Sequence, residues 1–388
     1  MISSKIDEFN LIWLPDKSIL ENIMLDDWPD LASAILEKII ELGKIDSVFT
    51  LVKSEKGLNG YDEVYTSDVG FLALAYHTAW IRQGVYLSIS ARNLADILKS
   101  QNIEVFELIQ MLMSVTDYFG GETRISKIDV AIDFIDESQS VDDISNHISD
   151  DWVVTDYTGR KSKARIDRHS MTVGNRTKVD TVYVGSKKGK TNNFLRIYNK
   201  KQEQEDNNGI YYDVAKKATD WVRFEASLRH DYAHQIGAMI LDVSSVAEES
   251  SLLFKIFTDR YRFADANSKS NSRIWVDLTN SMIALADDSI NPLRLEYGEP
   301  ADLDKQYEYL MTNSGLMSFM YRIEQRLGSD AVEEFLNSVY SNYEKFPVPE
   351  YVVNDTLKQV NRDKVLGVSP KKPWIDFQYK HDMIYESD

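Results

Sequence analysis

The sequence predicts an α+β fold with a mostly antiparallel central sheet and packed helices, followed by a helical C-terminal region. Two observations lead to this prediction. In the first two-thirds of the chain, segments with strand composition outnumber helical ones and several follow each other after short loops, which favours antiparallel pairing. After Asp231 the apolar residues recur at helical spacing almost throughout. Hydrophobic residues make up 43% of the 388 residues, which is enough for a proper core.

The expected elements follow from local patterns. β-Branched and aromatic residues predict strands at residues 8–14, 47–52, 71–77, 85–90, 127–135, around 152, 181–184, 194–200 and 221–229. Apolar residues at helical spacing predict helices at 31–42, 105–119, 141–148, 233–243, 246–261, 275–286, 304–327 and 329–343. A polar run at 267–272 and prolines after residue 290 suggest a first domain over residues 1–280 and a helical region over 281–388, whose role no residue indicates.

Composition excludes several classes of protein. The chain has no cysteine, which removes disulfide frameworks, zinc fingers and thiol catalysis and fits a reducing compartment. No apolar run approaches the roughly 20 residues that a membrane span needs, and the first residues lack the pattern of a signal peptide. We therefore expect a soluble, cytoplasmic protein without a membrane partner.

The charge is unevenly distributed. The net charge is −18, which by itself argues against a nucleic-acid partner. The stretch from Arg160 to Lys201, however, contains thirteen lysines and arginines and only two aspartates, so its net charge is +11. The remaining residues therefore carry a net charge of −29. Such a stretch can hold a phosphate backbone in one place, although a solvated basic loop would show the same composition.

The segment Lys127–Ile135 carries two carboxylates on one face of a strand. Alternation places Asp129, Ala131 and Asp133 together, opposite the apolar face. Two carboxylates separated by one small residue suit a divalent cation with oxygen ligands, Mg²⁺ or Mn²⁺. An ordinary amphipathic strand with a wet acidic face would show the same pattern.

The next segment reads as a β-hairpin with a glycine- and lysine-rich turn that contains Lys187, Lys188 and Lys190. In its second strand Tyr198 lies between Arg196 and Lys200 on one face. These cations could steer a phosphate and stabilise a phenolate, although most strand tyrosines are structural.

The third segment, Trp221–Arg229, alternates apolar with polar residues. Glu225 could complete the carboxylate set, and Arg223 and Arg229 could contact DNA or the leaving phosphate. A cross-strand ladder of ion pairs is the other interpretation of this pattern.

Taken in order, these segments resemble the Rep_trans family of plasmid rolling-circle replication initiators. The matching segments are Lys127–Asp133, Tyr183–Ser186, Arg196–Glu203 and Trp221–Glu225, and the resemblance covers roughly residues 5 to 280. Ser90–Asn93 departs from the small-residue turn of the family. No His-x-His pair occurs, so the two-histidine metal site of other rolling-circle nucleases is absent.

The resemblance implies a nickase that cuts and rejoins one strand of origin DNA through a 5′-phosphotyrosine, with Tyr198 as the nucleophile beside Arg196 and Lys200. Asp129, Asp133 and Glu225 are then the candidate ligands of Mg²⁺ or Mn²⁺, and the role of Glu203 stays open. The expected partners are a hairpin or supercoiled origin, a second copy of the chain in a homodimer, and a host helicase. A conjugative relaxase of the MobT kind, or a non-catalytic protein that binds an origin or promoter, are the alternatives.

Overall fold

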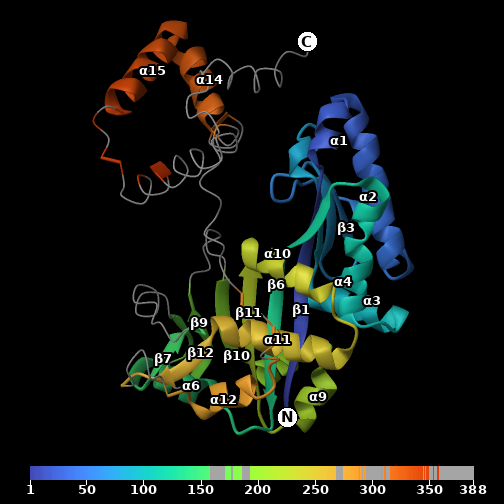
Figure 1. Cartoon of the computed structure of the whole chain (residues 1–388), viewed down its shortest axis with the longest axis vertical. Helices are drawn as coiled ribbons and strands as arrows, with labels where there is room; N and C mark the ends of the chain where they lie inside the picture. Colours follow the sequence, from blue (N-terminus) through green and yellow to red (C-terminus); the bar gives the residue numbers. More distant parts are fainter. Residues whose placement is uncertain are drawn as a thin grey trace. The chain divides into compact units, whose positions relative to one another are not determined.

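The computed structural model describes residues 1–157, 171–175, 178–185, 193–267, 274–287 and 315–343, with a few isolated positions between 289 and 357. The chain forms two compact units, Met1–Arg294 and Leu295–Asp388. Figure 1 shows a large sheet at the centre of the first unit. In the described part of the chain, all of its strand pairings are antiparallel. The α+β fold expected from the sequence is therefore confirmed.

The sheet has ten strands, and its centre is formed by strands that are distant in sequence. Their order is β2 (Leu51–Lys53), β3 (Glu63–Ser67), β4 (Leu72–Tyr76), β5 (Val85–Ile89), β1 (Ile2–Leu14), β6 (Glu122–Ile135), β11 (Trp221–Arg229), β10 (Asn193–Asn199), β9 (Lys178–Val184) and β8 (Met171–Asn175). The long strands β1 and β6 pair along almost their whole length. The expected strand at residues 47–52 is only the short β2, and β3 was not expected from the sequence.

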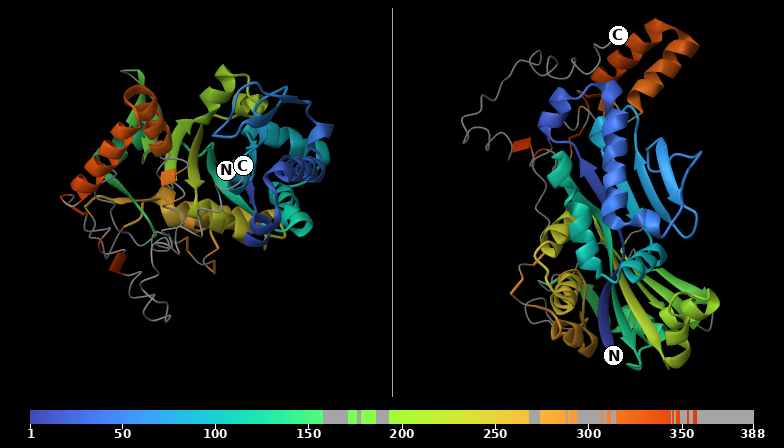
Figure 2. Two further views of the ribbon diagram at one scale, coloured as in Figure 1. Left: turned by 90° about the horizontal axis from the view of Figure 1, so that it is seen from above. Right: turned by 90° about the vertical axis from the view of Figure 1, so that its right-hand side faces the viewer.

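Helices cover one face of this sheet (Figure 2). The main ones are α2 (Trp28–Gly43), α4 (Val105–Met113), α10 (Asp231–Ile240) and α11 (Val246–Arg260). Shorter ones are α1 (Lys17–Asn22), α3 (Ala91–Gln101), α5 (Val115–Phe119) and the 3₁₀ turns Leu25–Asp27, Ile45–Ser47 and Ile81–Gln83. The apolar side chains of β6 and β11 face these helices: Phe224, for example, packs edge-on against Phe257 of α11 at 6.3 Å between ring centroids. This burial supplies most of the favourable free energy of such a fold.

A second layer of elements lies beside the far end of the sheet. A two-stranded sheet pairs β7 (Trp152–Thr155) with β12 (Arg262–Asp265), next to α6 (Val141–Asp150) and α12 (Asp277–Ile283). The short helices α8 (Lys200–Asp206) and α9 (Tyr212–Lys217) follow β10 and lead into β11. Because α8 begins at Lys200, this residue starts a helix and does not end the strand as expected.

Several elements differ from the expectation for local reasons. The expected helix 105–119 is two helices that meet at Ser114, whose Oγ donates to the carbonyl of Met111 at 2.7 Å. Helix α3 was not expected from the sequence, since only Asn93, Leu94 and Ile97 are buried and the apolar stripe is short. The C-terminal unit contains α14 (Leu316–Leu327) and α15 (Ser329–Tyr343), in which no described residue is buried. None of the described helices is long and apolar enough to span a membrane.

Candidate functional site

The face of the sheet opposite the helices carries the predicted site residues. Pairing of β10 with β11 sets Arg196 opposite Glu225 and Tyr198 opposite Arg223. Pairing of β11 with β6 sets the same two β11 residues opposite Ala131 and Asp133, and sets Ser227 opposite Asp129. Directly paired residues share a face, so three strands bring these side chains together. Tyr198 and the carboxylates thus lie on the same side of the sheet.

Tyr198 is 7% exposed, and its hydroxyl donates to Glu225 Oε2 at 3.1 Å. The Arg196 guanidinium lies 4.6 Å from the centroid of the tyrosine ring, and Lys200 Nζ lies 5.6 Å from it. Burial raises the pKa of Tyr198 well above its usual value, and the Glu225 carboxylate raises it further against the opposing effect of Arg223. The flanking cations therefore surround the ring as expected, but the phenolate is not favoured in this arrangement.

Asp129 lies close enough to Glu225 for their carboxylates to interact, and one of its own oxygens is unpaired within the described part of the chain. Asp129 is 6% exposed, and its Oδ1 has no hydrogen-bond partner among the described residues; neither does the neighbouring Ser227 Oγ. Burial raises the pKa of Asp129 to about 7; Lys127, 3.1 Å from its Oδ2, opposes this, while Glu8 and Glu225 add to it. An unpaired buried oxygen beside a second carboxylate fits a hard divalent cation.

Asp133 belongs to a different cluster. Its carboxylate accepts two hydrogen bonds from Arg223, both at 2.7 Å, and a third from Trp221 Nε1 at 2.8 Å. The third described donor of Arg223, Nη1, reaches Asp7 Oδ1 at 2.8 Å. The structure therefore does not bring all three predicted carboxylates to one ion, and no group of three metal-ligating side chains occurs among the described residues. Asp133 instead anchors an arginine.

Arg223 was expected to contact DNA, but its side chain is fully buried. Its side chain cannot reach a phosphate at the surface. It forms ion pairs with Asp133 and Asp7 instead and so stabilises the strands that carry the site. Arg229 lies partly exposed at the end of the same strand face, opposite Lys127, where a DNA contact stays a prediction. Lys187, Lys188 and Lys190 lie outside the described residues, as do nine in all of the thirteen lysines and arginines of the basic stretch.

Two site residues on β1 were not foreseen. A bulge between Ile6 and Glu8 breaks the register of β1 against β6 at Asp7. Burial alone would raise the pKa of Asp7, but Arg223, Lys5 and Lys200 outweigh it and hold the pKa at about 2. Glu8, which pairs with Asp129 in the register, forms an ion pair with Lys127. The acidic residues of the segment Lys5–Glu8 were the only signal for this role in the sequence.

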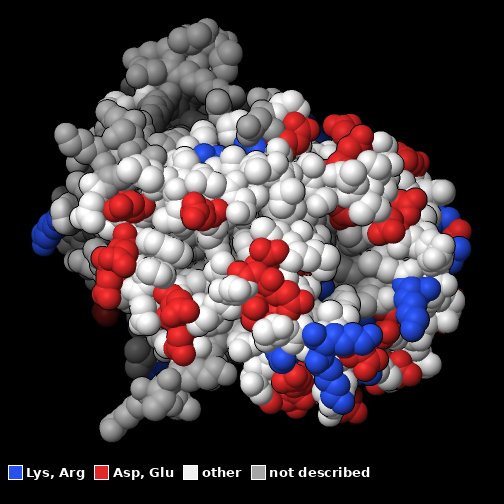
Figure 3. All heavy atoms as spheres, turned by 90° about the horizontal axis from the view of Figure 1, so that it is seen from below, with Lys and Arg blue, Asp and Glu red and all other residues white. Residues whose placement is uncertain are grey.

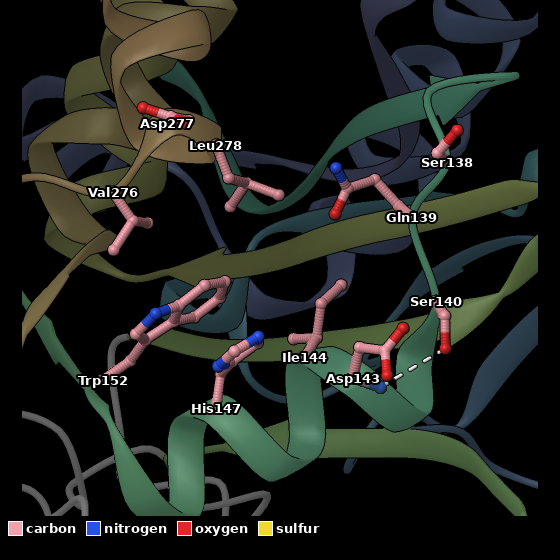
Figure 4. A pocket seen from close by; sticks show the side chains of 10 residues that line it. All are labelled: Ser138, Gln139, Ser140, Asp143, Ile144, His147, Trp152, Val276, Asp277 and Leu278. Atoms are coloured by element: carbon pink, nitrogen blue, oxygen red, sulfur yellow. Dashed lines mark hydrogen bonds between the residues drawn. The ribbon is translucent and has the colours of Figure 1, made fainter.

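The surface at the N-terminal end of the first unit carries charges of both signs among neutral side chains (Figure 3). Figure 3 shows acidic side chains spread over the face at the N-terminal end, with basic ones gathered mainly toward one side. A cavity of about 370 Å³ lies between α6 and α12. In Figure 4 the rings of His147 and Trp152 lie stacked among its lining residues, with 4.6 Å between the ring centroids. None of its described lining residues is a lysine, an arginine or a predicted site residue.

Fold and site together define an α+β protein with a tyrosine, arginines and carboxylates on one face of an antiparallel sheet. The family model described as replication initiation factor, Rep_trans, matches residues 123–336. Because this match covers more than half of the chain, the protein belongs to that family.

One solved structure similar to the chain is described as a rolling-circle replication initiator protein from Geobacillus stearothermophilus. It shows 18% identity and a TM-score of 0.49, with 74% of this chain and 97% of the other covered. No curated protein matches the chain.

Proposed function

We propose that this protein nicks and rejoins one strand of origin DNA through Tyr198 and so starts rolling-circle replication. The observation that carries the proposal is the hydrogen bond from the Tyr198 hydroxyl to Glu225, with Arg196 and Lys200 around the ring. This arrangement lies inside the region that matches the replication initiation factor family. It supplies an oxygen nucleophile, an acceptor for its hydrogen bond and cations for a phosphate.

In the proposed reaction the Tyr198 hydroxyl passes its proton to Glu225, to which it is hydrogen-bonded. The tyrosine oxygen attacks the scissile phosphorus, and the bond from phosphorus to the 3′ oxygen breaks. The 3′ oxygen leaves with the bonding electron pair and takes up a proton from water, while the 5′ phosphate stays on the tyrosine. One phosphodiester replaces another, so the reverse reaction rejoins the strand. Arg196 and Lys200 would stabilise the negative charge that builds up on the phosphate oxygens.

Asp129 and Glu225 are the residues that would hold Mg²⁺ or Mn²⁺. They fit such an ion because Asp129 Oδ1 is buried and unpaired within the described residues, and because both side chains offer oxygen ligands. The ion would polarise the scissile phosphate. Asp133 is left out of this set, since its oxygens already accept hydrogen bonds from Arg223 and Trp221.

The Asp129→Asn variant tests, through the pH dependence of stability, whether Asp129 is buried as a proposed ion ligand. The folded pKa of Asp129 is about 7, above the value of 3.8 that a free aspartate has. A raised folded pKa favours folding fully below the unfolded value and loses that contribution as the pH rises through 7. We therefore expect the wild type to lose roughly 4 kcal/mol of stability between pH 4 and pH 8, at about 1.4 kcal/mol for each unit of the shift, and the variant to lose less.

Mn²⁺ should stabilise the wild type at pH 8 and leave Asp129→Asn unchanged in thermal unfolding. Asp68→Asn, an exposed carboxylate whose Oδ1 accepts from the backbone of Thr50, serves as the control. Equal stabilisation of Asp129→Asn and the wild type would place the ion elsewhere.

The proposed partners are origin DNA, a second copy of the chain and a host helicase. The basic stretch of residues 160–201 is the expected contact for the phosphates. If five or six of its cations contact DNA, the logarithm of the binding constant should fall with the logarithm of the salt concentration with a slope of about −5.

Neutralising Lys187, Lys188 and Lys190 together should flatten this slope by up to about 3. Neutralising Lys17, Lys38 and Lys53, which form ion pairs elsewhere in the first unit, is the matched control and should leave it unchanged. A slope near zero for the wild type would show that this stretch does not hold DNA.

The proposed activity is tested by mixing the protein with Mn²⁺ and a supercoiled plasmid that carries the DNA flanking its gene. We expect nicked circles with covalently attached protein. Specific binding without any nicking would favour a non-catalytic origin-binding protein.

A further inference from the structure

Arg196 makes two contacts at the site at once. Its Nη2 donates to Glu225 Oε1 at 2.5 Å, and its guanidinium lies over the Tyr198 ring. The other oxygen of Glu225, Oε2, accepts the tyrosine hydroxyl. The three side chains therefore satisfy one another, and each oxygen of the carboxylate already has a donor.

Arg196 is also the arginine of this site that can leave its partner. Its side chain is 40% exposed, whereas Arg223 is fully buried and joined to two carboxylates. A guanidinium binds a phosphate through two parallel hydrogen bonds, which is a better match than one bond to a carboxylate. A DNA phosphate that arrives over Tyr198 would therefore compete with Glu225 for Arg196.

Resting on the function proposed above, we infer that Arg196 exchanges the Glu225 carboxylate for a phosphate when DNA binds. In the absence of a phosphate it holds Glu225 and covers Tyr198. With a phosphate present it turns to the DNA, which leaves the Glu225 carboxylate uncompensated beside Asp129. Two adjacent carboxylates attract a divalent cation, so DNA binding and ion binding become favourably coupled.

This exchange predicts a coupling that a purely structural arginine would not show. A thymidine dinucleotide, which carries one phosphodiester, should tighten Mn²⁺ binding to the wild type by about tenfold. Arg196→Gln should bind Mn²⁺ about tenfold more tightly than the wild type without the dinucleotide, and the dinucleotide should add nothing further. Isothermal titration calorimetry measures both effects on the full chain.

The matched control is Arg124→Gln, since Arg124 also pairs with a glutamate, Glu122, at 3.6 Å, elsewhere on β6. It should behave like the wild type. If Arg196→Gln binds Mn²⁺ with unchanged affinity, or if the dinucleotide still tightens binding to it, Arg196 does not gate the ion. Retention of Mn²⁺ binding by Asp129→Asn would instead contradict the ion site of the proposed function, which separates the two failures.

A second readout needs no metal. Because Arg196 lies over the ring, its loss should expose Tyr198, and acetylation of Tyr198 by N-acetylimidazole should be at least about fivefold faster in Arg196→Gln. Mass spectrometry of the peptide that contains residue 198 gives this rate in metal-free protein. An unchanged rate would overturn the inference even if no metal bound to either protein.

Discussion

Tyr198→Phe is expected to abolish nicking and adduct formation while leaving duplex binding within a few-fold of the wild type. The variant loses only the nucleophilic oxygen, and Arg196 and Lys200 remain for the phosphate. A loss of about 10⁴-fold or more in the rate of nicking is expected, since no other group replaces the nucleophile. Plasmid nicking on agarose gels and DNA binding by anisotropy measure the two properties separately.

The control for this experiment is Tyr183→Phe. Tyr183 lies opposite Arg196 on the neighbouring strand β9 and thus shares the face of the site. It should nick within a few-fold of the wild-type rate. A phenylalanine variant at position 198 that still becomes attached to DNA would remove Tyr198 from the reaction.

The second large effect concerns stability. Arg223→Met should lower the free energy of unfolding by about 3–5 kcal/mol, because it leaves Asp133 and Asp7 buried without their shared cation. Urea denaturation at pH 7 measures this loss. Lys53→Met, which breaks an exposed ion pair with Glu63, should cost less than about 1 kcal/mol.

The stability lost in Arg223→Met should depend on pH, because Asp7 titrates at low pH. Asp7 has a folded pKa of about 2, below the value of 3.8 that a free aspartate has. Its contribution to stability is therefore present above pH 4 and is lost as the pH falls toward 2. The difference between the wild type and Arg223→Met should therefore shrink over that window. A constant difference between pH 5 and pH 2.5 would show that the Asp7–Arg223 pair does not stabilise the fold.

The sequence was sufficient for the strands that carry the site. Alternation placed Arg196 and Tyr198 on one face, as it did Asp129 and Asp133, and the register of β10, β11 and β6 shows the same arrangement. This worked because the side-chain period of a strand is a local property. Alternation could not reveal that Asp133 pairs with Arg223, since a carboxylate that binds a metal ion and one that binds an arginine look alike in sequence.

The contribution of β1 could not be foreseen for a different reason. Asp7 reaches Arg223, 216 residues later in the chain, only because β1 lies beside β6 and a bulge shifts its register there. A bulge redirects side chains, and no local composition signals its position. Likewise, the burial of Asp129 depends on side chains from several strands, whereas its own segment fitted a metal site and a wet acidic face equally well.

The most direct test of the account identifies the residue that becomes attached to DNA. The wild-type protein is incubated with Mn²⁺ and a supercoiled plasmid carrying its origin, the products are digested with nuclease and protease, and the nucleotide-bearing peptide is sequenced by mass spectrometry. We expect a single modified peptide, with a 5′-linked nucleotide on Tyr198. A nucleotide on any other residue, or nicked DNA with no attached peptide, would contradict the proposed mechanism.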